Sequence, residues 1–227
     1  KVVADSRSTR GDINLVSHAH MDHGFQGEGE VVTSEMTARI LSERTGSELQ
    51  HSSHPDFELI PSGHIIGSRS VLFGDEERIL YTGDVSLQDR VYMDGFQPVD
   101  ADVLVVESTY GIPAYRLPDM EEVVRRIQDW VKDKDGNLFL FGYSLGKAQK
   151  IQKIVEQVDD RPIIAHGAVK KMNDVVEEVT DREFRAIPYG ENKDKLEDGA
   201  VFIGPTRASR SDWMEKNIER YGGVKAG

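Results

Sequence analysis

Four potential metal ligands lie within six residues of the sequence, namely His18, His20, Asp22 and His23. Neutral imidazoles and carboxylates are standard zinc ligands, and three or four of them per ion leave a coordination position open for water. In a tight loop, this spacing would direct alternate side chains to one metal ion and turn the last two toward another. Because such clustering needs a reason, we interpret the segment as a metal site rather than a loop that happens to be rich in histidine.

Two residues further along the chain could complete this site. Asp84 follows an apolar run and a glycine, and its two carboxylate oxygens could bridge two cations. On its own, an aspartate in that position would more often be a turn residue or a helix cap. His64 also follows a glycine and, taken alone, fits a loop histidine with a satisfied hydrogen bond equally well. The assignment of both therefore depends on the cluster upstream.

Short apolar runs surround these ligands. Residues 13–17 predict a buried strand that delivers the cluster from its carboxyl end, and residues 31–33 predict another short strand. Residues 34–46 predict a helix that begins at a serine N-cap and ends at a glycine. Three more strands are expected within residues 57–84, and residues 101–108 form the strand that we expect to be the most deeply buried.

The pattern changes after residue 112. An amphipathic helix is predicted near residues 120–133, and apolar strands and helices then alternate, as in parallel βα units. The sequence therefore predicts an α/β fold, with a core domain over residues 1–112 and a second, smaller α/β domain over residues 113–227.

Composition restricts the class of protein. The chain has 227 residues, no cysteine and a formal charge of −12. Disulfides are thus excluded, and any zinc must be held by His, Asp and Glu. No apolar run approaches the roughly 20 residues that cross a bilayer, so we expect no membrane association and a cytoplasmic protein. The acidic charge argues against a broad basic face that coats nucleic acid, but not against a nuclease whose metal ions neutralise the scissile phosphate locally.

The ligand set resembles that of the metallo-β-lactamase superfamily. Its HxHxDH motif is matched by His18, His20, Asp22 and His23, and its later ligands by His64 and Asp84. The resemblance implies that His18, His20 and His64 hold a first zinc, and that Asp22, His23 and a bridging Asp84 hold a second. Two zinc ions are therefore expected in the complete enzyme.

Three further segments resemble the β-CASP nucleases, the branch that includes mRNA 3′-end cleavage factors and DNA-repair nucleases. They are GHIIGSRSVLFGDEERILYTGDVS, ADVLVVESTYG and GNLFLFGYSLGKAQKI. The resemblance implies a metallo-β-lactamase αββα core with an inserted or appended short β-CASP-like cap. Glu107 matches an acidic position of that branch, and such a carboxylate could accept a hydrogen bond from a metal-bound histidine. Its alternative is a charge at a strand end that faces water.

Two groups of residues could contact substrate in the second domain. Lys147 and Gln149 open a helix after a glycine, where a cation and backbone N–H groups could hold a phosphate. Arg207 and Arg210 follow a strand and could clamp another phosphate. Lys147, together with Lys150 and Lys153, could equally form the solvated face of that helix.

The remaining histidines do not fit the metal motif. We expect His51 and His54 to be surface residues, and His166, at the end of a strand, to be packed or solvated, with substrate contact as the alternative. The resemblance implies a further zinc-ligating histidine downstream, which we do not find. We therefore expect the chain to be a fragment of a longer protein with a weak second metal site.

Together these features predict a zinc-dependent phosphodiesterase that acts on RNA, or on single-stranded DNA, with Asp22, His23 and Glu107 in catalysis. The alternatives are a small-molecule hydrolase of the lactonase or thioesterase type, and a catalytically silent scaffold that binds nucleic acid. The sequence does not distinguish exonuclease from endonuclease action, and it leaves the oligomeric state open, a homodimer included.

Overall fold

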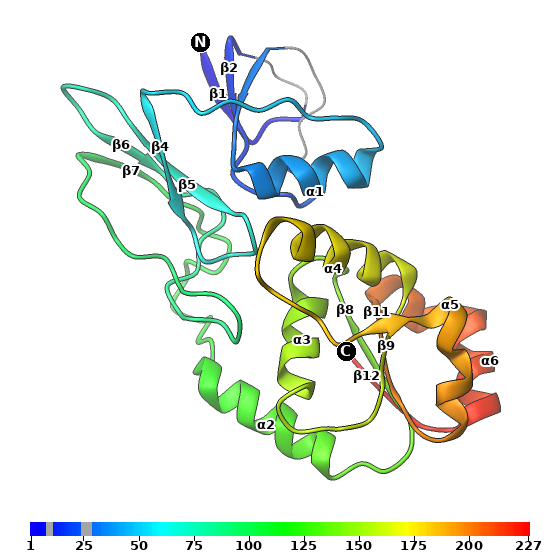
Figure 1. Ribbon diagram of the computed structural model, residues 1–227. Helices are drawn as coiled ribbons and strands as arrows, with labels where there is room; N and C mark the ends of the chain where they lie inside the picture. Colours follow the sequence, from blue (N-terminus) through cyan, green and yellow to red (C-terminus); the bar gives the residue numbers. More distant parts are fainter. Residues whose placement is uncertain (8–10, 24–28) are drawn as a thin grey trace. The chain divides into compact units, whose positions relative to one another are not determined.

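The computed structural model describes residues 1–7, 11–23 and 29–227, which form two compact units, Lys1–Leu117 and Pro118–Gly227 (Figure 1). Gly24, the residue that follows the predicted ligand His23, lies outside the described residues. The fold is mixed α/β, as predicted. The assignment of the units to a metallo-β-lactamase core and a β-CASP cap stays a prediction.

The first unit begins with three short parallel strands in the order β1 (Val2–Ala4), β2 (Ile13–Leu15), β3 (Glu30–Val32). Helix α1 (Glu35–Thr45) follows, and it confirms the helix predicted from its caps. Ser34 accepts a hydrogen bond from the Thr37 N–H at its start, and Gly46 adopts the left-handed conformation at its end, with φ of 72°.

A second sheet of the first unit has the order β4-β5-β6-β7. Its strands are β4 (Phe57–Pro61), β5 (Arg69–Phe73), β6 (Ile79–Tyr81) and β7 (Val103–Val105). The first three pair antiparallel, and β7 pairs parallel to β6. Buried side chains from the two sheets share one small apolar cluster around Leu15, Val32 and Val71. Packing between the sheets thus fixes the ends of β2 and β6, which lead into the candidate ligands.

Strand β7 is not the deeply buried strand that we predicted. The exposed fractions of Leu104, Val105 and Val106 are 59%, 47% and 51%. The reason is its position in the sheet, because β7 is the last strand and pairs only with β6. An apolar run is typical of a strand with neighbours on both sides, but it cannot by itself distinguish such a strand from one at an edge.

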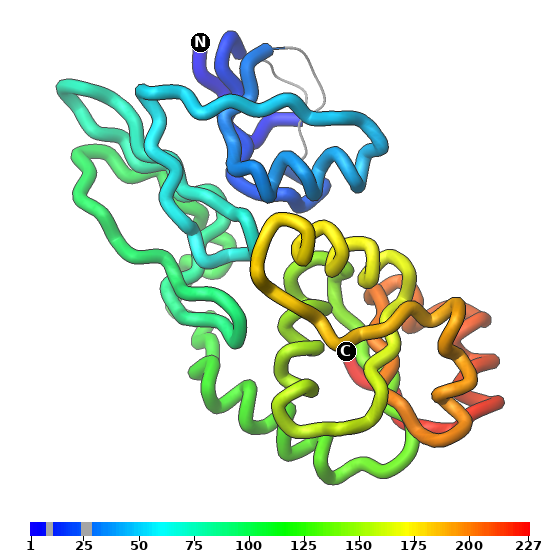
Figure 2. The backbone as a smooth tube through the Cα atoms, in the orientation of Figure 1, coloured from blue at the N-terminus to red at the C-terminus, as the bar shows by residue number. Residues whose placement is uncertain are grey.

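The second unit contains one fully parallel sheet in the order β10-β9-β11-β8-β12. The course of the chain, coloured by residue number, can be followed in Figure 2. Its strands are β8 (Leu138–Gly142), β9 (Ile163–Ala165), β10 (Ile187–Pro188), β11 (Val201–Pro205) and β12 (Val224–Ala226). The main helices are α2 (Met120–Lys132), α3 (Lys147–Val155), α4 (Gly167–Val179) and α6 (Asp212–Tyr221). This alternation confirms the predicted parallel βα units.

Apolar layers cover both faces of this sheet. Alternate residues of β8 and β11 point to opposite faces, as the pleat of a strand requires. Leu138, Leu140 and Val201 pack with α2, α3 and α4, whereas Phe139 and Phe202 pack with α6 and the short helices α5 (Tyr189–Asn192), η1 (Lys193–Glu197) and η2 (Thr206–Arg210). The sheet is therefore buried between two layers of helices.

Two buried polar groups fasten this core. The Asn137 side chain accepts a hydrogen bond from Ala200 N and donates to the carbonyls of Leu196 and Tyr221. Gln152 and Asn173 join α3 to α4 through reciprocal amide hydrogen bonds. Because an amide buried without partners is costly, these residues specify how the loops and helices meet.

In the part of the chain that the structure describes, no helix is both long and apolar enough to cross a membrane.

Candidate metal centre

The chain runs straight from β2 into the predicted ligands, held by neighbours on both sides. Val16 N donates to Val32 O, and Ser17 O accepts from Arg69 N. Thr33 Oγ1 donates to Val16 O. These bonds continue the pairing beyond the strand and bury His18 to 1% exposure. His18 is therefore fixed by the two sheets and not by a free loop.

His18, His20, His64 and Asp84 come together in one group, in which one potential ligand atom from each lies within 4.8 Å of all the others. His64 Nε2 lies 3.2 Å from His20 Nδ1 and 3.3 Å from Asp84 Oδ2. His18 Nε2 lies 3.8 Å from the same carboxylate oxygen. Three imidazoles and one carboxylate are a ligand set that suits zinc.

Two glycines allow His64 and Asp84 to reach this position. Gly63 has φ of 70°, and a side chain there would place Cβ 2.5 Å from the carbonyl oxygen of Ser86. Gly83 has φ of 55°, and its Cβ would lie 2.4 Å from Ser17 Oγ. Since no other residue tolerates both the conformation and the crowding, the glycine before each candidate ligand is a structural requirement.

The protonation states favour cation binding. Burial, together with the neighbouring histidines, lowers the pKa of His18 and of His64 to about 3, so both imidazoles are neutral at neutral pH. Burial and then the nearby Glu107 carboxylate raise the pKa of Asp84. His18 Nε2 is buried and has no hydrogen-bond partner among the described residues. A metal ion would coordinate the unpartnered lone pair of His18 and would stabilise the negative charge of Asp84. These residues therefore fit the metal that their types predict.

Asp5 lies beside the candidate centre, and the sequence did not reveal it. Its carboxylate accepts hydrogen bonds from Ser17 N at 2.8 Å, Ser17 Oγ at 2.6 Å and Tyr81 OH at 2.7 Å. His23 Nδ1 lies 3.3 Å from Asp5 Oδ2. Burial alone would raise the pKa of Asp5, but these neighbours outweigh it and lower the pKa. The only local signal is an aspartate after the apolar run at residues 2–4.

The Asp5–Ser17 pair also sets the tautomer of His18. Ser17 Oγ donates its one proton to Asp5. The same oxygen lies 2.9 Å from His18 Nδ1 and therefore accepts a hydrogen bond from Nδ1–H. The lone pair of His18 is then on Nε2, the atom that faces Asp84. Asp5 thereby acts on the candidate metal centre through Ser17.

His23 and Asp22 are placed differently from the other predicted ligands. His23 joins Asp5 and His18 in a second group whose ligand atoms also lie within 4.8 Å of one another. The nearby Asp5 carboxylate, outweighing burial, raises the pKa of His23. The Asp22 side chain is 77% exposed and belongs to neither group. The structure thus gathers four of the six predicted metal ligands at one point, and the predicted second set is not assembled.

Glu107 lies beside this centre. Its Oε1 accepts a hydrogen bond from Val85 N at 3.1 Å, which fixes the backbone directly after Asp84. No hydrogen bond to a histidine is recorded for it in the described chain. This contact favours a role in positioning Asp84 over the histidine contact that we predicted.

The four predicted substrate contacts lie in the second unit and differ in exposure. Gln149 is fully buried, and its amide accepts from Gly146 N and donates to Ser144 O and Asn173 Oδ1. The position favours a structural role for this residue. Arg207 and Arg210 are exposed on η2.

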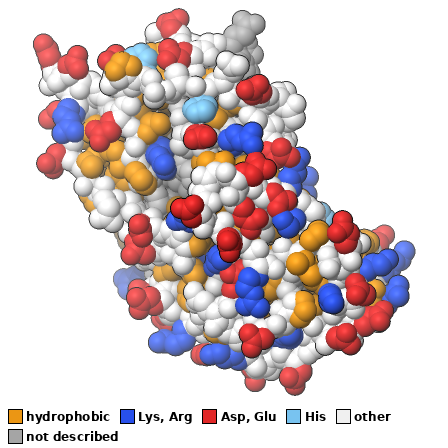
Figure 3. Space-filling model, viewed as in Figure 1, with side chains coloured by type: hydrophobic (Ala, Val, Ile, Leu, Met, Phe, Trp, Pro, Cys, Tyr) orange, Lys and Arg blue, Asp and Glu red, His pale blue; other side chains and the backbone are white. Residues whose placement is uncertain are grey.

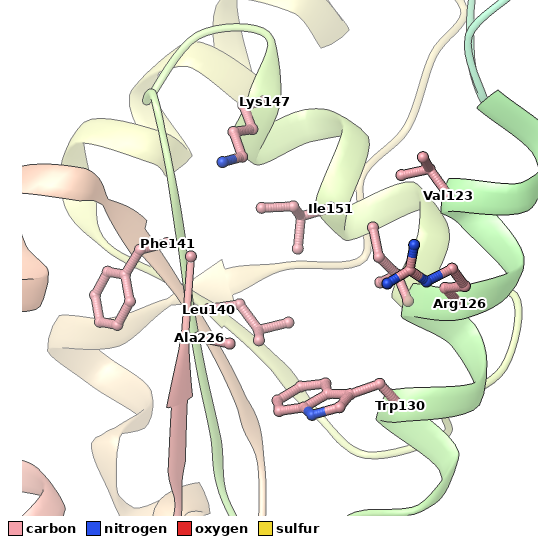
Figure 4. Close-up of a pocket in the computed structure, with 10 residues that line it drawn as sticks. Val123, Arg126, Trp130, Leu140, Phe141, Lys147, Ile151 and Ala226 are labelled. Carbon is pink, nitrogen blue, oxygen red and sulfur yellow. The ribbon is translucent and has the colours of Figure 1, made fainter. Parts of the chain in front are cut away.

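Lys147 stands at the side of an apolar groove. Its stem packs over Gly142, where a Cβ would approach Lys147 Cγ to 2.8 Å. Figure 4 shows Lys147 above this groove, with Trp130, Ile151 and Leu140 around it and Arg126 on α2. The groove has a volume of about 530 Å³. Lys147 is exposed, so its ammonium group can reach solvent or an anion.

The other histidines have separate surroundings. His51 is exposed, and His54 Nδ1 accepts a hydrogen bond from Asp56 N in the same loop. His166 caps α4 by accepting a hydrogen bond from Ala168 N. In the described residues, none of the three belongs to a group that could hold a metal ion.

No family model matches the chain. Curated proteins do. A probable DNA ligase of Opitutus terrae is 29% identical over 219 residues, which are 89% of this chain and 21% of that protein. An RNase J-like protein of Methanocaldococcus jannaschii is 28% identical over 245 residues, 84% of this chain and 58% of that protein. Cleavage and polyadenylation specificity factor subunit 3 of Dictyostelium discoideum is 32% identical over 101 residues, 42% of this chain and 13% of that protein.

The chain spans only part of these relatives, from 13% of the cleavage and polyadenylation factor subunit to 58% of the RNase J-like protein. Proteins named for RNase J, for cleavage and polyadenylation factor subunit 3 and for the endoribonuclease YSH1 recur among the matches. All three are β-CASP metallo-β-lactamase nucleases. The HxHxDH segment and the convergence of His18, His20, His64 and Asp84 agree with that kinship. The chain is therefore similar to nucleases of the β-CASP branch of the metallo-β-lactamase superfamily.

Proposed function

We propose that the protein is a zinc-dependent phosphodiesterase that cleaves RNA. The observation that carries the proposal is the group formed by His18, His20, His64 and Asp84, in which a buried imidazole nitrogen lacks a hydrogen-bond partner among the described residues. The relatives named as an RNase J-like protein and as endoribonucleases supply the substrate class. We further propose that Lys1–Leu117 is the metallo-β-lactamase core and Pro118–Gly227 the β-CASP cap.

The residues of the candidate metal centre have different roles in this proposal. His18, His20, His64 and Asp84 would hold the metal ion, which when bound supplies the Lewis acidity that stabilises negative charge developing on a phosphodiester. Asp5 keeps His18 in the Nε2 lone-pair tautomer through Ser17. Glu107 holds the backbone next to Asp84. Asp22, the exposed carboxylate at the mouth of the cluster, is suited to accept or orient a proton of the attacking water.

A second zinc ion is part of the proposal, at Asp22, His23 and Asp84, and we expect it to bind more weakly than the first. His23 already has a carboxylate partner in Asp5, and Asp22 is mostly exposed. Both side chains would have to rearrange before they could bind the second zinc ion, which makes its binding less favourable.

DNA is the second candidate substrate. The Opitutus relative is named as a probable DNA ligase, and its similarity covers 89% of this chain. A nuclease that trims DNA ends before ligation would need the same metal centre, so only the substrate separates this candidate from the first. The acidic net charge of −12 and the mixture of acidic and basic side chains on the face drawn in Figure 3 fit both candidates, because the metal would neutralise the phosphate locally.

The test compares labelled RNA and DNA oligonucleotides of the same sequence, with a lactone as a small-molecule control, in the presence of zinc or a chelator. We expect zinc-dependent cleavage of RNA, and His64→Ala should lower its rate by more than the roughly 100-fold upper range of outer-shell changes. His51→Ala is the matched control, an exposed histidine outside the cluster. Faster cleavage of DNA would favour the second candidate, and lactone hydrolysis without nuclease activity would contradict the proposal.

A further inference from the structure

Three loops lie side by side at the carboxyl edge of the five-stranded sheet. In the strand register, Gly142 of β8 is opposite Pro205 of β11, and Ala165 of β9 is opposite Ile203. The residues that leave these strands are Tyr143, Thr206 and His166. His166 N donates to Ile203 O at 2.8 Å, which ties the β9 loop to β11.

These loops diverge to opposite faces of the sheet. The chain leaves β8 and β9 for α3 and α4, which pack on one face through Ala148 and Val169. It leaves β11 for η2 and α6, which pack on the other face through Ala208 and Met214. Parallel α/β sheets bind ligands where neighbouring connections diverge in this way, outside the carboxyl ends of the strands.

Aromatic side chains stand at this edge. Trp213, at the start of α6, is 38% exposed, and its ring is held by Tyr189 and His166, with centroids 4.9 and 6.2 Å away. Both contacts are edge-to-face, with interplanar angles of 79°. Tyr143 is 70% exposed. A partly exposed tryptophan held in place by other rings loses little side-chain entropy when a second ring stacks on it.

Hydrogen-bond donors suitable for phosphate flank these rings. Arg207 and Arg210 are exposed on η2, the segment between β11 and Trp213. Lys225 donates to Ser209 O and so helps to hold this segment. His166 uses Nδ1 as an acceptor for Ala168 N, which leaves Nε2–H as a donor. The acidic residues in the first turn of α6 are Asp212 and Glu215.

We propose that this carboxyl edge binds single-stranded nucleic acid, with bases stacked on Trp213 and Tyr143 and phosphates held by Arg207 and Arg210. Aromatic rings interleaved with cations are how proteins bind single strands without regard to sequence. The identity of the ligand rests on the proposed nuclease function, but the stacking surface itself does not involve the metal centre.

The experiment uses tryptophan fluorescence, because the chain has only two tryptophans. Trp130→Phe leaves Trp213 as the single reporter, and Trp130 lies in the separate apolar groove. We titrate this protein, with metal removed to prevent cleavage, with an oligouridine and with an abasic oligomer of equal length. Only the oligouridine should quench the fluorescence, and in the unmutated background Trp213→Leu should weaken its binding about tenfold while leaving abasic binding unchanged.

Two further variants keep the result interpretable. Trp213→Phe preserves an aromatic ring and should retain most of the affinity, which separates stacking from a folding defect. Arg207→Gln combined with Arg210→Gln should weaken binding of both oligomers and reduce its salt dependence. Quenching without any cleavage by the metal-loaded protein would contradict the proposed nuclease function but would support the stacking proposal. Cleavage without quenching, or equal losses for both oligomers in Trp213→Leu, would overturn the stacking proposal alone.

Discussion

In Pro118–Gly227, one parallel sheet lies between two apolar layers, and its buried polar groups are satisfied by one another or by the backbone. In Lys1–Leu117, two sheets of short strands share one small apolar cluster, and the unit also contains a partly buried group of histidines and a carboxylate. The second unit therefore has the usual hydrophobic source of stability. The first unit contains a group of polar side chains in which carboxylates repel one another and buried imidazole nitrogens lack hydrogen-bond partners among the described residues. A bound cation would relieve both effects.

This contrast has a physical meaning. A site that is crowded with neutral imidazoles and a carboxylate of raised pKa is prepared to bind a cation, and that preparation lowers the stability of the empty unit. A sheet that is buried on both faces has no such dependence. The difference between the units can therefore be strengthened or removed by metal, by mutation and by pH.

The largest expected effect is stabilisation of the first unit by metal. Ligand at about 1,000 times its dissociation constant adds about 4 kcal/mol to the stability of the state that binds it. Zinc should thus slow hydrogen exchange strongly at the amides of Val16, Ser17 and Arg69, and leave β8 and β11 unchanged. Exchange measured by mass spectrometry with and without zinc gives both values in one experiment.

The control for this prediction is His18→Ala, which removes a candidate ligand and should abolish the zinc effect, whereas His54→Ala should preserve it. If zinc protected β8 and β11 as much as β2, the contrast between the units would be lost.

An intermediate effect should follow from Asn137→Ala in the second unit. The change strips partners from Ala200 N, Leu196 O and Tyr221 O in the interior, so we expect a loss of about 2–4 kcal/mol in the free energy of unfolding. Urea unfolding measures this loss. Asn192→Ala is the matched control, since it removes a single bond to Pro188 O in a partly exposed turn and should cost about 1 kcal/mol or less. Zinc should not rescue the first variant.

The smallest effect concerns pH in the metal-free protein. The pKa values of His18 and His64 are lowered to about 3 in the fold, against about 6.5 in an unfolded chain. Between these values the unfolded state binds more protons, so stability is full above about pH 6.5 and declines as pH falls. From pH 7 to pH 6 the first unit should lose about 1.4 kcal/mol, about 0.7 kcal/mol from each histidine.

This loss is measured as the change in unfolding free energy between pH 7 and pH 6 in the presence of a chelator. In the double variant His18→Ala, His64→Ala the change should be much smaller. A pH dependence equal to that of the parent would mean that other groups titrate, and the explanation based on these two histidines would fail.

Local patterns in the sequence sufficed for the regular elements and for the residues that converge. The capped helix α1 and the alternation of β8, α3, β9 and α4 follow from periodicity and turn residues. The clustering of His18 and His20 in the sequence, and the resemblance of His64 and Asp84 to the later metallo-β-lactamase ligands, marked the residues that the fold brings together. Each of these features depends on near neighbours in the chain or on a compact motif.

Residues defined by distant pairing were missed or misjudged. Asp5 meets Ser17 because β1 and β2 pair in parallel with Ala4 opposite Leu15, and no local pattern reveals that register. Gln149 follows a glycine at a helix start, which suggested a phosphate contact, but Asn173 of α4 engages its amide in the interior. Leu104 is apolar yet exposed, because β7 has only one neighbouring strand.

The central claim is that the polar group of the first unit is a zinc centre. The most direct measurement is anomalous diffraction at the zinc absorption edge from crystals of the protein grown with zinc. We predict a strong peak bonded to His18, His20, His64 and Asp84, at roughly the 2.0–2.2 Å typical of zinc with nitrogen and oxygen ligands. A map with no peak at these four residues, or with zinc bound only to surface carboxylates, would contradict it.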